Sequence, residues 1–223
     1  SFTAFMESGK TNAGADNCPV FCLFDNEEVG SQTKQGAAST FLYDVLNRVS
    51  AACGLDAAGM ARKVSQSFLV SCDNAHAVHP NHPEYTDATH RPVMNGGVVI
   101  KYNANQRYTT DGLSAAVFGQ ICRTAGAELQ RYSNRPDLPG GSTLGNISLC
   151  HVSVPTADIG LPQLAMHSAY ETAATADAIA DYARIATTPL GQMLRVNDWF
   201  CVNYQYDTSK SIYRPDLLFS EKT

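Results

Sequence analysis

Short apolar runs alternate with amphipathic segments along most of the chain. Residues 18–25, 67–73 and 97–103 form runs that are rich in β-branched or aromatic residues and end at polar or turn residues. This pattern is typical of buried strands. A fourth candidate strand covers residues 152–159. We therefore predict a sheet that is built from these runs.

Two segments between the runs have the spacing of helices that cover a sheet. Apolar residues recur there at i, i+3 or i+4, and i+7 or i+8, and Asp111 is a candidate N-cap for the second segment. These residues are Leu42, Val45, Leu46 and Val49 in the first segment and Leu113, Val117, Phe118 and Ile121 in the second. The alternation predicts an α/β fold with a mainly parallel or mixed sheet and helices on both faces, in three layers.

Composition and charge narrow the class of partner. The 223 residues are 44% hydrophobic and 17% charged, with a formal net charge of -5. No polybasic stripe for nucleic acid or an anionic membrane is present. No run approaches the roughly 18 apolar residues of a membrane span, and Ser1 does not open a signal peptide. We expect a soluble, unexported protein that acts on a small substrate or a protein partner.

The cysteines favour reduced thiols over a disulfide framework. Their number is odd, and most of them lie inside apolar segments. A cysteine-rich zinc site is not expected, because no CxxC pair occurs. The cysteines are Cys18, Cys22, Cys53, Cys72, Cys122, Cys150 and Cys201.

Polar residues that can bind metal ions or take part in catalysis lie where the predicted strands end. Open α/β sheets bind their ligands beyond the carboxyl ends of the strands. We therefore expect these side chains to lie close together at one edge of the sheet. In chain order, they are Glu27 and Glu28, Asp73 and His76, Lys101, and His167.

The adjacent glutamates Glu27 and Glu28 are the most unusual of these. Paired glutamates usually lie on a solvated helix face, but this pair follows an apolar run and precedes Gly30. Neighbouring residues in extended backbone point to opposite sides. One glutamate can then bind a cation while the other faces the substrate as a general base. A glycosidase that uses both carboxylates is disfavoured, because adjacent residues do not flank a bond at the separations of about 5 to 9.5 Å which that chemistry needs.

The histidines and Asp73 have both structural and metal-binding interpretations. Residues 71–92 contain four of the six histidines, and loop histidines near prolines serve as caps or satisfied polar groups as well as ligands. Asp73 closes a buried strand, where a carboxylate needs a cation or a donor. His167 precedes a helix that we expect to begin near Tyr170, so capping is its alternative role. Together, these oxygen and nitrogen donors suit zinc, manganese or cobalt better than calcium.

Two further features have an open interpretation. The stretch GGSTLGN, residues 140–146, has the glycine content of a backbone cradle for a substrate carbonyl or carboxylate, or of a plain turn before a helix. Its spacing does not match a P-loop. Lys101 lies inside an apolar run, where it can neutralise an acidic substrate or reach the surface from the strand end.

Several long motifs together resemble the M18 metallopeptidases, the aspartyl aminopeptidases, and are similar above all to bacterial members. The resemblance runs in order from Ser1 to about residue 190. The motifs are FDNEEVGSQTKQGAAS, SCDNAHAVHPNHPEY, HRPVMNGGVVIKYNANQRY, GGSTLGN and DIGLPQLAMHSAYETA.

The resemblance implies a cytoplasmic enzyme with two divalent metal ions, usually zinc, that removes acidic residues from peptide N-termini. It also implies a large homo-oligomer, commonly a tetrahedral dodecamer. Glu27 matches the general base, Glu28 and His167 match ligands of one metal, and Asp73 matches a ligand of the other. His76 and Lys101 match residues that contact the substrate, and Lys101 would face its carboxylate.

The chain also departs from the family pattern. The family has an earlier metal-binding histidine and a bridging aspartate in a Leu-Asp-Asn motif, with a dimerisation domain inserted between them, and neither ligand occurs here. We expect residues 1–190 to be the C-terminal part of an M18-like catalytic domain, incomplete at its N-terminus, and residues 191–223 to be a tail of unclear origin. The alternative function is that of an inactive fragment or an interaction module of such an enzyme.

Overall fold

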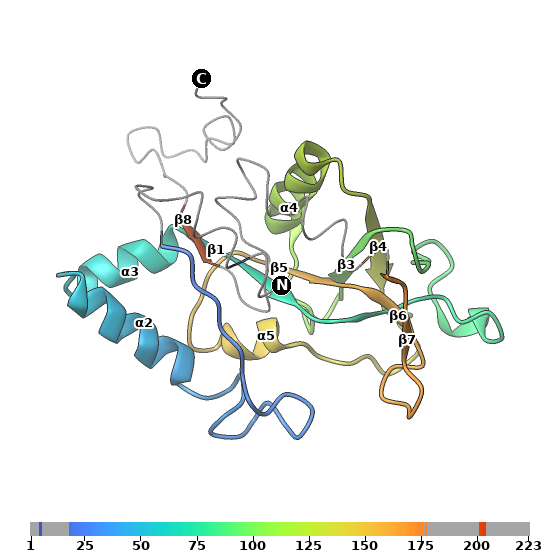
Figure 1. Cartoon of the computed structure of the whole chain (residues 1–223), viewed down its shortest axis with the longest axis horizontal. Helices are drawn as coiled ribbons and strands as arrows, with labels where there is room; N and C mark the ends of the chain where they lie inside the picture. The colour runs from blue at the N-terminus through green and yellow to red at the C-terminus, as the bar shows by residue number, and fades with distance from the viewer. Residues whose placement is uncertain (1–4, 6–17, 176, 178–200, 204–223) are drawn as a thin grey trace.

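The computed structural model describes residue 5, residues 18–175, residue 177 and residues 201–203. Helices lie on both sides of a central sheet (Figure 1). The three-layer α/β arrangement expected from the sequence is thereby confirmed. Among the described residues, no helix has the length and apolar character that crossing a membrane requires.

The central sheet is mixed, with the order β4-β3-β5-β1-β8. Its strands are β1 (Ser67–Cys72), β3 (Val98–Tyr102), β4 (Leu129–Ser133), β5 (Thr156–Gly160) and β8 (Cys201–Asn203). β1 pairs parallel with β5, and β3 pairs parallel with β4. The contacts of β3 with β5 and of β8 with β1 are antiparallel. The sheet therefore consists of two parallel pairs that run in opposite directions, with β8 added beside β1.

A small second sheet continues the ends of β1 and β5. It has the order β2-β6-β7, with β2 (Ala75–His76) parallel to β6 (Pro162–Leu164) and β6 antiparallel to β7 (Thr172–Ala173). Asp73 and Asn74 join β1 to β2, and Leu161 joins β5 to β6. Both joints lie side by side, since Gly160 approaches the backbone of Asp73 and Asn74 closely.

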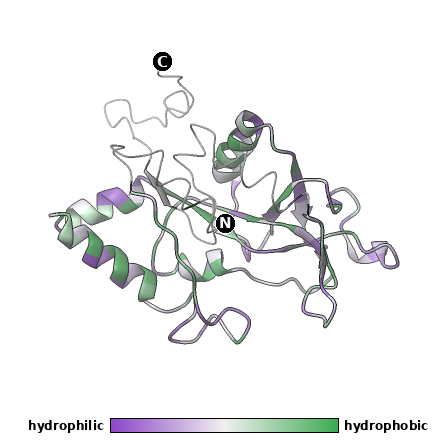
Figure 2. Cartoon of the chain, viewed as in Figure 1, coloured by the Kyte–Doolittle hydropathy of each residue, from purple (hydrophilic) through white to green (hydrophobic). Residues whose placement is uncertain are grey.

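The helix α4 (Gly112–Ala125) covers one face of the central sheet. Asp111 is its N-cap, as the sequence predicts, and it also forms a capping box with Ser114. Figure 2 shows hydrophobic ribbon on α4 and along the strands that it covers. The buried residues of this layer are Phe68, Val70, Cys72, Val98, Ile100, Val117, Phe118, Ile121, Cys122, Ala157 and Ile159.

The opposite face is covered by α5 (Leu144–Ser148), with α2 (Phe41–Ala52) and α3 (Ala57–Ser65) toward one end (Figure 1). A second core lies here, formed by Cys22, Ala37, Leu42, Leu69, Leu144, Val152 and Val154. Within α2 only Leu42 is buried. Val45 and Val49, which the helical spacing also places on the apolar face, are 36% and 43% exposed.

Residues 18–25, predicted as the first strand, do not form one. Their backbone is irregular, and the apolar side chains of Cys22 and Phe24 pack against the second core instead. β1 already pairs with β5 on one side and with β8 on the other, so its backbone edges are occupied. The run is therefore apolar because it covers the core, which periodicity alone cannot distinguish from a buried strand.

Two other boundaries differ from the prediction. The strand expected at residues 152–159 begins only at Thr156, directly after Pro155, which has no backbone N–H to donate. The helix expected near Tyr170 does not begin there: Tyr170 lies in an exposed turn, β7 follows it, and the next described helical residue is Thr175. The interpretation of His167 as the cap of that helix is therefore wrong.

The cysteines are divided between the core and the surface. Cys22, Cys72 and Cys122 are buried as expected, whereas Cys18, Cys53 and Cys150 are exposed thiols. Apolar neighbours in sequence do not guarantee burial, because Cys53 lies just past the end of α2 and Cys150 in the turn after α5.

Residues 1–4 and 6–17, and most of the predicted tail at residues 191–223, lie outside the described residues. Of the tail, only residues 201–203 are described, as β8.

Gly160 brings β5 against the chain just after β1, which makes it a sensitive position. A Cβ atom there would meet the backbone of Asp73, Asn74 and Ala75. We expect Gly160→Ala to lower the free energy of unfolding by about 1 to 3 kcal/mol, as overpacking does. Gly112→Ala is the matched control, since its added methyl group meets nothing within 4 Å. Urea unfolding checks this, and equal midpoints for the two variants would contradict the close approach.

Candidate active site

The residues that the sequence singles out all line one pocket. Glu27, Glu28, Asp73, His76, Lys101 and His167 surround a cavity of about 290 Å³ at the ends of β1 and β5. Further lining residues are Asn74, Ala75, Tyr108, Tyr132, Gly141, Ser142, Thr143, Gln163, Met166 and Glu171. The expected convergence of these side chains is therefore present in the fold.

Glu27 and Glu28 reach the pocket from a turn rather than from a strand end. The turn is closed by hydrogen bonds from Asn26 Nδ2 to Thr33 Oγ1, 3.1 Å, and from Thr33 Oγ1 to the carbonyl of Gly30, 3.0 Å. Gly30 has a φ of 147°, which an L side chain rarely adopts. The glycine after the glutamates thus allows the tight turn that presents them.

Glu28 and His167 form a pair at the mouth of the pocket. Glu28 Oε2 lies 3.3 Å from His167 Nε2, and both side chains are largely exposed. His167 has a φ of 65° and Ala165 a φ of 57°, a conformation that costs a non-glycine residue about 1 kcal/mol or more. The backbone N–H of His167 donates to Glu171 Oε1. The loop between β6 and β7 therefore holds the imidazole in a strained but defined position.

Asp73 and Lys101 form the floor of the pocket. Asp73 follows β1 directly, and its N–H donates to the carbonyl of Ile159. Lys101 is only 2% exposed; its Nζ donates to the carbonyl of Asn74 at 3.1 Å and lies 3.8 Å from Asp73 Oδ2. Lys101 Nζ also lies 5.4 Å from the ring centroid of Tyr108, within range of a cation–π contact. The lysine is a buried cation inside the pocket and does not reach the bulk surface.

Lys101 arrives there by a different route from the one expected. β3 runs antiparallel to β5, with Ile100 opposite Ile159, so its carboxyl end points away from the edge where Asp73 lies. Val98 and Ile100 face α4, and Val99 packs with Tyr108 on the other face. Alternation puts Lys101 on that second face as well, and its long side chain spans the distance to Asp73.

The surroundings shift the pKa of two pocket residues. Partial burial of the carboxyl group, with Asp73 and Glu28 nearby, raises the pKa of Glu27 above its ordinary value. Desolvation of the ring, with Lys101 and His167 nearby, lowers the pKa of His76. His76 is therefore a neutral imidazole at neutral pH, which can donate one hydrogen bond and accept another.

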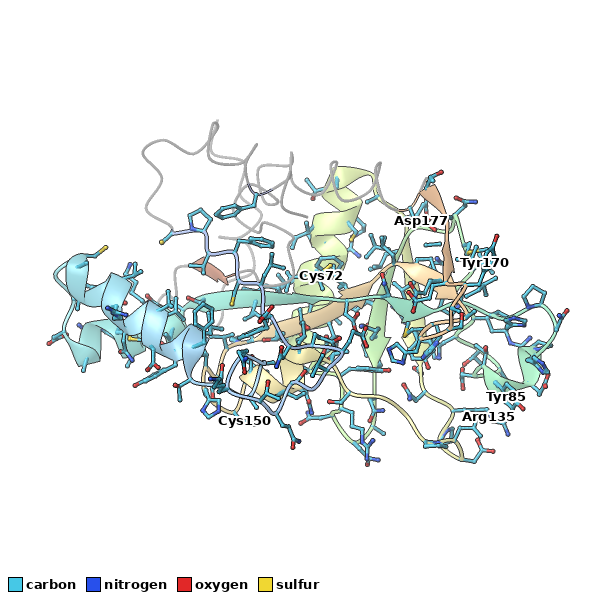
Figure 3. All side chains as sticks on the ribbon, turned by 60° about the horizontal axis from the view of Figure 1, so that its bottom comes forward. Cys72, Tyr85, Arg135, Cys150, Tyr170 and Asp177 are labelled. Atoms are coloured by element: carbon cyan, nitrogen blue, oxygen red, sulfur yellow. The ribbon has the colours of Figure 1, made fainter. Side chains whose placement is uncertain are left out.

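The other histidines of residues 71–92 do not line this pocket. His82 Nδ1 lies 3.1 Å from Glu84 Oε1, and His90 Nδ1 lies 3.2 Å from Asp87 Oδ1. His79 and His82 line a neighbouring cavity of about 350 Å³ that also includes Tyr85 and Arg135. Figure 3 shows Tyr85 and Arg135 close to each other at one end of the molecule. The structural interpretation holds for His82 and His90, which pair with local carboxylates.

The stretch GGSTLGN covers four residues without regular structure and the first three residues of α5, and it also lines the pocket. Gly141, Ser142 and Thr143 lie on the pocket wall, and Thr143 precedes the helix. The stretch therefore leads into a helix, as one interpretation expects, and its role as a backbone cradle for the substrate stays a prediction. Seven lining residues carried no separate prediction: Asn74, Ala75, Tyr108, Tyr132, Gln163, Met166 and Glu171. Tyr108 lies in a motif that the resemblance used, whereas Tyr132 on β4 gave no signal in the sequence.

The donors of the pocket fit a zinc ion only in part. Glu28 and His167 offer a carboxylate oxygen and an imidazole nitrogen close together, and these are preferred zinc ligands. Within the described part of the chain, however, no three His, Cys, Asp or Glu side chains come close enough to hold a metal ion. Since a catalytic zinc ion takes three protein ligands and a water molecule, the pair supplies two of the three protein ligands of one such site.

Comparison with known proteins decides the family. The profile described as Aminopeptidase I zinc metalloprotease (M18) matches residues 1–186. The chain belongs to the M18 family. Two curated relatives are each described as a probable M18 family aminopeptidase 2. The protein from Clostridium acetobutylicum is 49% identical over 158 residues, and the protein from Mycobacterium leprae is 46% identical over 168 residues.

Solved structures of M18 proteins share the fold. A structure of the Ape4 and Nbr1 complex superposes with a TM-score of 0.75 at 35% identity, over 82% of this chain and 35% of that one. Yeast aminopeptidase 1 gives a TM-score of 0.68 at 25% identity, over 82% and 41%. The matches to the two curated M18 relatives cover 71% and 75% of this chain but only 36% and 39% of theirs. The chain therefore spans well under half the length of these relatives.

Proposed function

We propose that this M18 chain forms the catalytic part of a metalloaminopeptidase that releases acidic residues from peptide N-termini. The observation that carries this proposal is the pocket itself. It places a carboxylate pair and His167 at its mouth and a buried cation, Lys101, on its floor. An acidic side chain that enters such a pocket meets a desolvated positive charge, where attraction is stronger than in water.

Each of the six pocket residues that the sequence singled out has a proposed role. Glu28 and His167 bind one metal ion, and Asp73 binds a second. Two observations support this assignment: Glu28 Oε2 lies 3.3 Å from His167 Nε2, and all three side chains line the same cavity. Lys101 and His76 contact the acidic side chain of the substrate. Zinc is the proposed metal, in line with the family description, and manganese and cobalt accept the same donors.

Divalent ions in such a site polarise the scissile carbonyl and make water a better nucleophile. Glu27 lies beside Glu28 but is the less exposed of the two. We assign it the transfer of the proton: its carboxylate accepts a proton from the attacking water and delivers it to the leaving amine. Lys101 and His76 hold the substrate so that its carbonyl stays within reach of the water molecule that Glu27 deprotonates.

We propose two further properties of the whole protein. We propose a homo-oligomer, because one structural neighbour is the S. cerevisiae mApe1 dodecamer, with a TM-score of 0.68 at 26% identity. We also propose a cytoplasmic location, as the resemblance implies.

A second function has an observation in its favour. The described residues provide no complete metal cluster, and the chain covers 36% and 39% of its two relatives. These facts favour a fragment that packs against another segment and is inactive by itself.

Metal loading separates the two functions. If the chain is an enzyme, elemental analysis will find two tightly bound metal ions per chain, and the protein will hydrolyse a peptide with an N-terminal aspartate. A chelator will abolish that activity, and added zinc will restore it. If the chain is an inactive fragment, neither metal nor hydrolysis will be found after incubation with zinc.

A further inference from the structure

Asp158 is a fully buried carboxylate in the middle of the central sheet. It lies on β5, with Ala157 and Ile159 on either side directed into the core beneath α4. Asp158 therefore points to the opposite face, and its exposed fraction is 0%. A buried carboxylate costs free energy unless donors compensate it. The roles proposed above for the pocket do not use this group.

The compensating donors come from two loops that are far apart in the sequence. Asp158 Oδ2 accepts hydrogen bonds from Thr109 N at 2.8 Å, from Thr109 Oγ1 at 3.0 Å and from Thr143 Oγ1 at 2.8 Å. Its backbone N–H donates to Thr110 Oγ1 at 2.8 Å. Asp158 Oδ1 is buried and has no hydrogen-bond partner among the described residues. All side-chain hydrogen bonds that the structure describes for Asp158 are therefore accepted by Oδ2, and their donors come from these two loops.

Both loops form walls of the pocket. Tyr108, directly before Thr109, lies beneath the Lys101 ammonium group at 5.4 Å. Gly141 and Ser142, directly before Thr143, line the cavity together with it. Hydrogen bonds to a charged acceptor are roughly twice as strong as neutral ones. One buried group therefore fixes two walls to the same strand.

The side of the pocket that Asp158 supports is the one around Lys101. In the described part of the chain its hydrogen bonds go to Thr109, Thr110 and Thr143, and none goes to Glu28 or His167. We propose that Asp158 is a positioning residue for the acidic end of the substrate. It acts by holding Tyr108 and the loop at residues 141–143 in place. This inference rests on the proposed aminopeptidase function.

The test uses the metal-loaded protein and a peptide with an N-terminal aspartate. Thr143→Val keeps the shape of the side chain but removes one donor, and Asp158→Asn keeps the volume but removes the charge. We expect each substitution to raise KM about tenfold, the equivalent of one buried hydrogen bond. We expect kcat to change much less and metal content to stay the same. Thr143→Ser, which restores the hydroxyl group, should bring KM back to that of the wild type.

Thr156→Val is the matched control on the same strand. Thr156 is also buried, but its hydroxyl group donates to the carbonyl of Val154 and not to a pocket loop. A KM rise in Thr156→Val equal to that in Thr143→Val would overturn the proposal. Loss of metal in Thr143→Val or Asp158→Asn would also overturn it. So would a lower melting temperature of these two variants with unchanged kinetics. If Asp158→Asn does not fold, the Thr143 pair still decides. A wild-type protein without hydrolysis refutes the proposed function instead.

Discussion

Replacing Glu27 with glutamine is expected to lower kcat by about 10²- to 10⁴-fold, the range that general acid–base catalysis contributes. The substitution keeps the size of the side chain and leaves an oxygen and an NH₂ group in place of the carboxylate. It removes the group that accepts the proton from water. Because Glu27 is not one of the proposed metal ligands, metal content and the melting temperature should stay at wild-type values.

Glu28→Gln is the matched comparison, since it makes the same chemical change at the adjacent position. Glu28 Oε2 lies 3.3 Å from His167 Nε2, so this variant should lose metal as well as activity. Elemental analysis of both variants, together with steady-state kinetics, checks the pair of roles. If Glu27→Gln loses metal and Glu28→Gln keeps it, the two roles are exchanged. If Glu27→Gln turns over at the wild-type rate, Glu27 is not the base.

Replacing Lys101 with methionine is expected to remove the preference for acidic N-terminal residues. Methionine matches the length of the lysine stem but carries no charge. A hydrogen bond to a charged group is worth about 1.5 to 3 kcal/mol, so kcat/KM for an aspartyl peptide should fall about 10- to 200-fold. The value for a peptide with an N-terminal leucine should change little, because its side chain does not use the ammonium group.

The ratio of the two kcat/KM values is the measurement that decides the role of Lys101. Lys63→Met serves as the control, since Lys63 lies exposed on α3 and should leave both values unchanged. An equal loss for both peptides would show that Lys101 supports the metal side through Asp73, 3.8 Å away, instead of selecting the substrate.

The sequence predicted the layers of the fold and the members of the pocket better than it predicted the route of the chain. Strand residues such as those of β1 and β3 are apolar on both faces and end at turn residues, and the Asp111 cap follows from local chemistry alone. Residues 18–25 have the same composition but cover the core without joining the sheet. The local sequence therefore predicts that a segment is buried, but it does not predict which other segments pack against it.

Long-range contacts account for the rest. Asp177 accepts hydrogen bonds from the backbone N–H groups of Asn95 and Gly97 at the start of β3. Asp158 likewise bonds to Thr109 and Thr143. The residues next to either aspartate in the sequence do not indicate which distant groups it binds. The antiparallel direction of β3 beside β5 is set by the same kind of distant pairing, so the path by which Lys101 enters the pocket could not be predicted.

The pairing of β1 with β5 has a consequence for how the protein is made. Leu69 of β1 lies opposite Thr156 of β5, and most of the described chain is synthesised between them. Closing so long a loop is a slow, entropy-limited step in folding. Asp73 and the Glu28–His167 pair meet only after that step, so the pocket that they line forms late. During synthesis, Glu27, Glu28 and Asp73 are therefore present before the pocket that brings them close to His167 has formed.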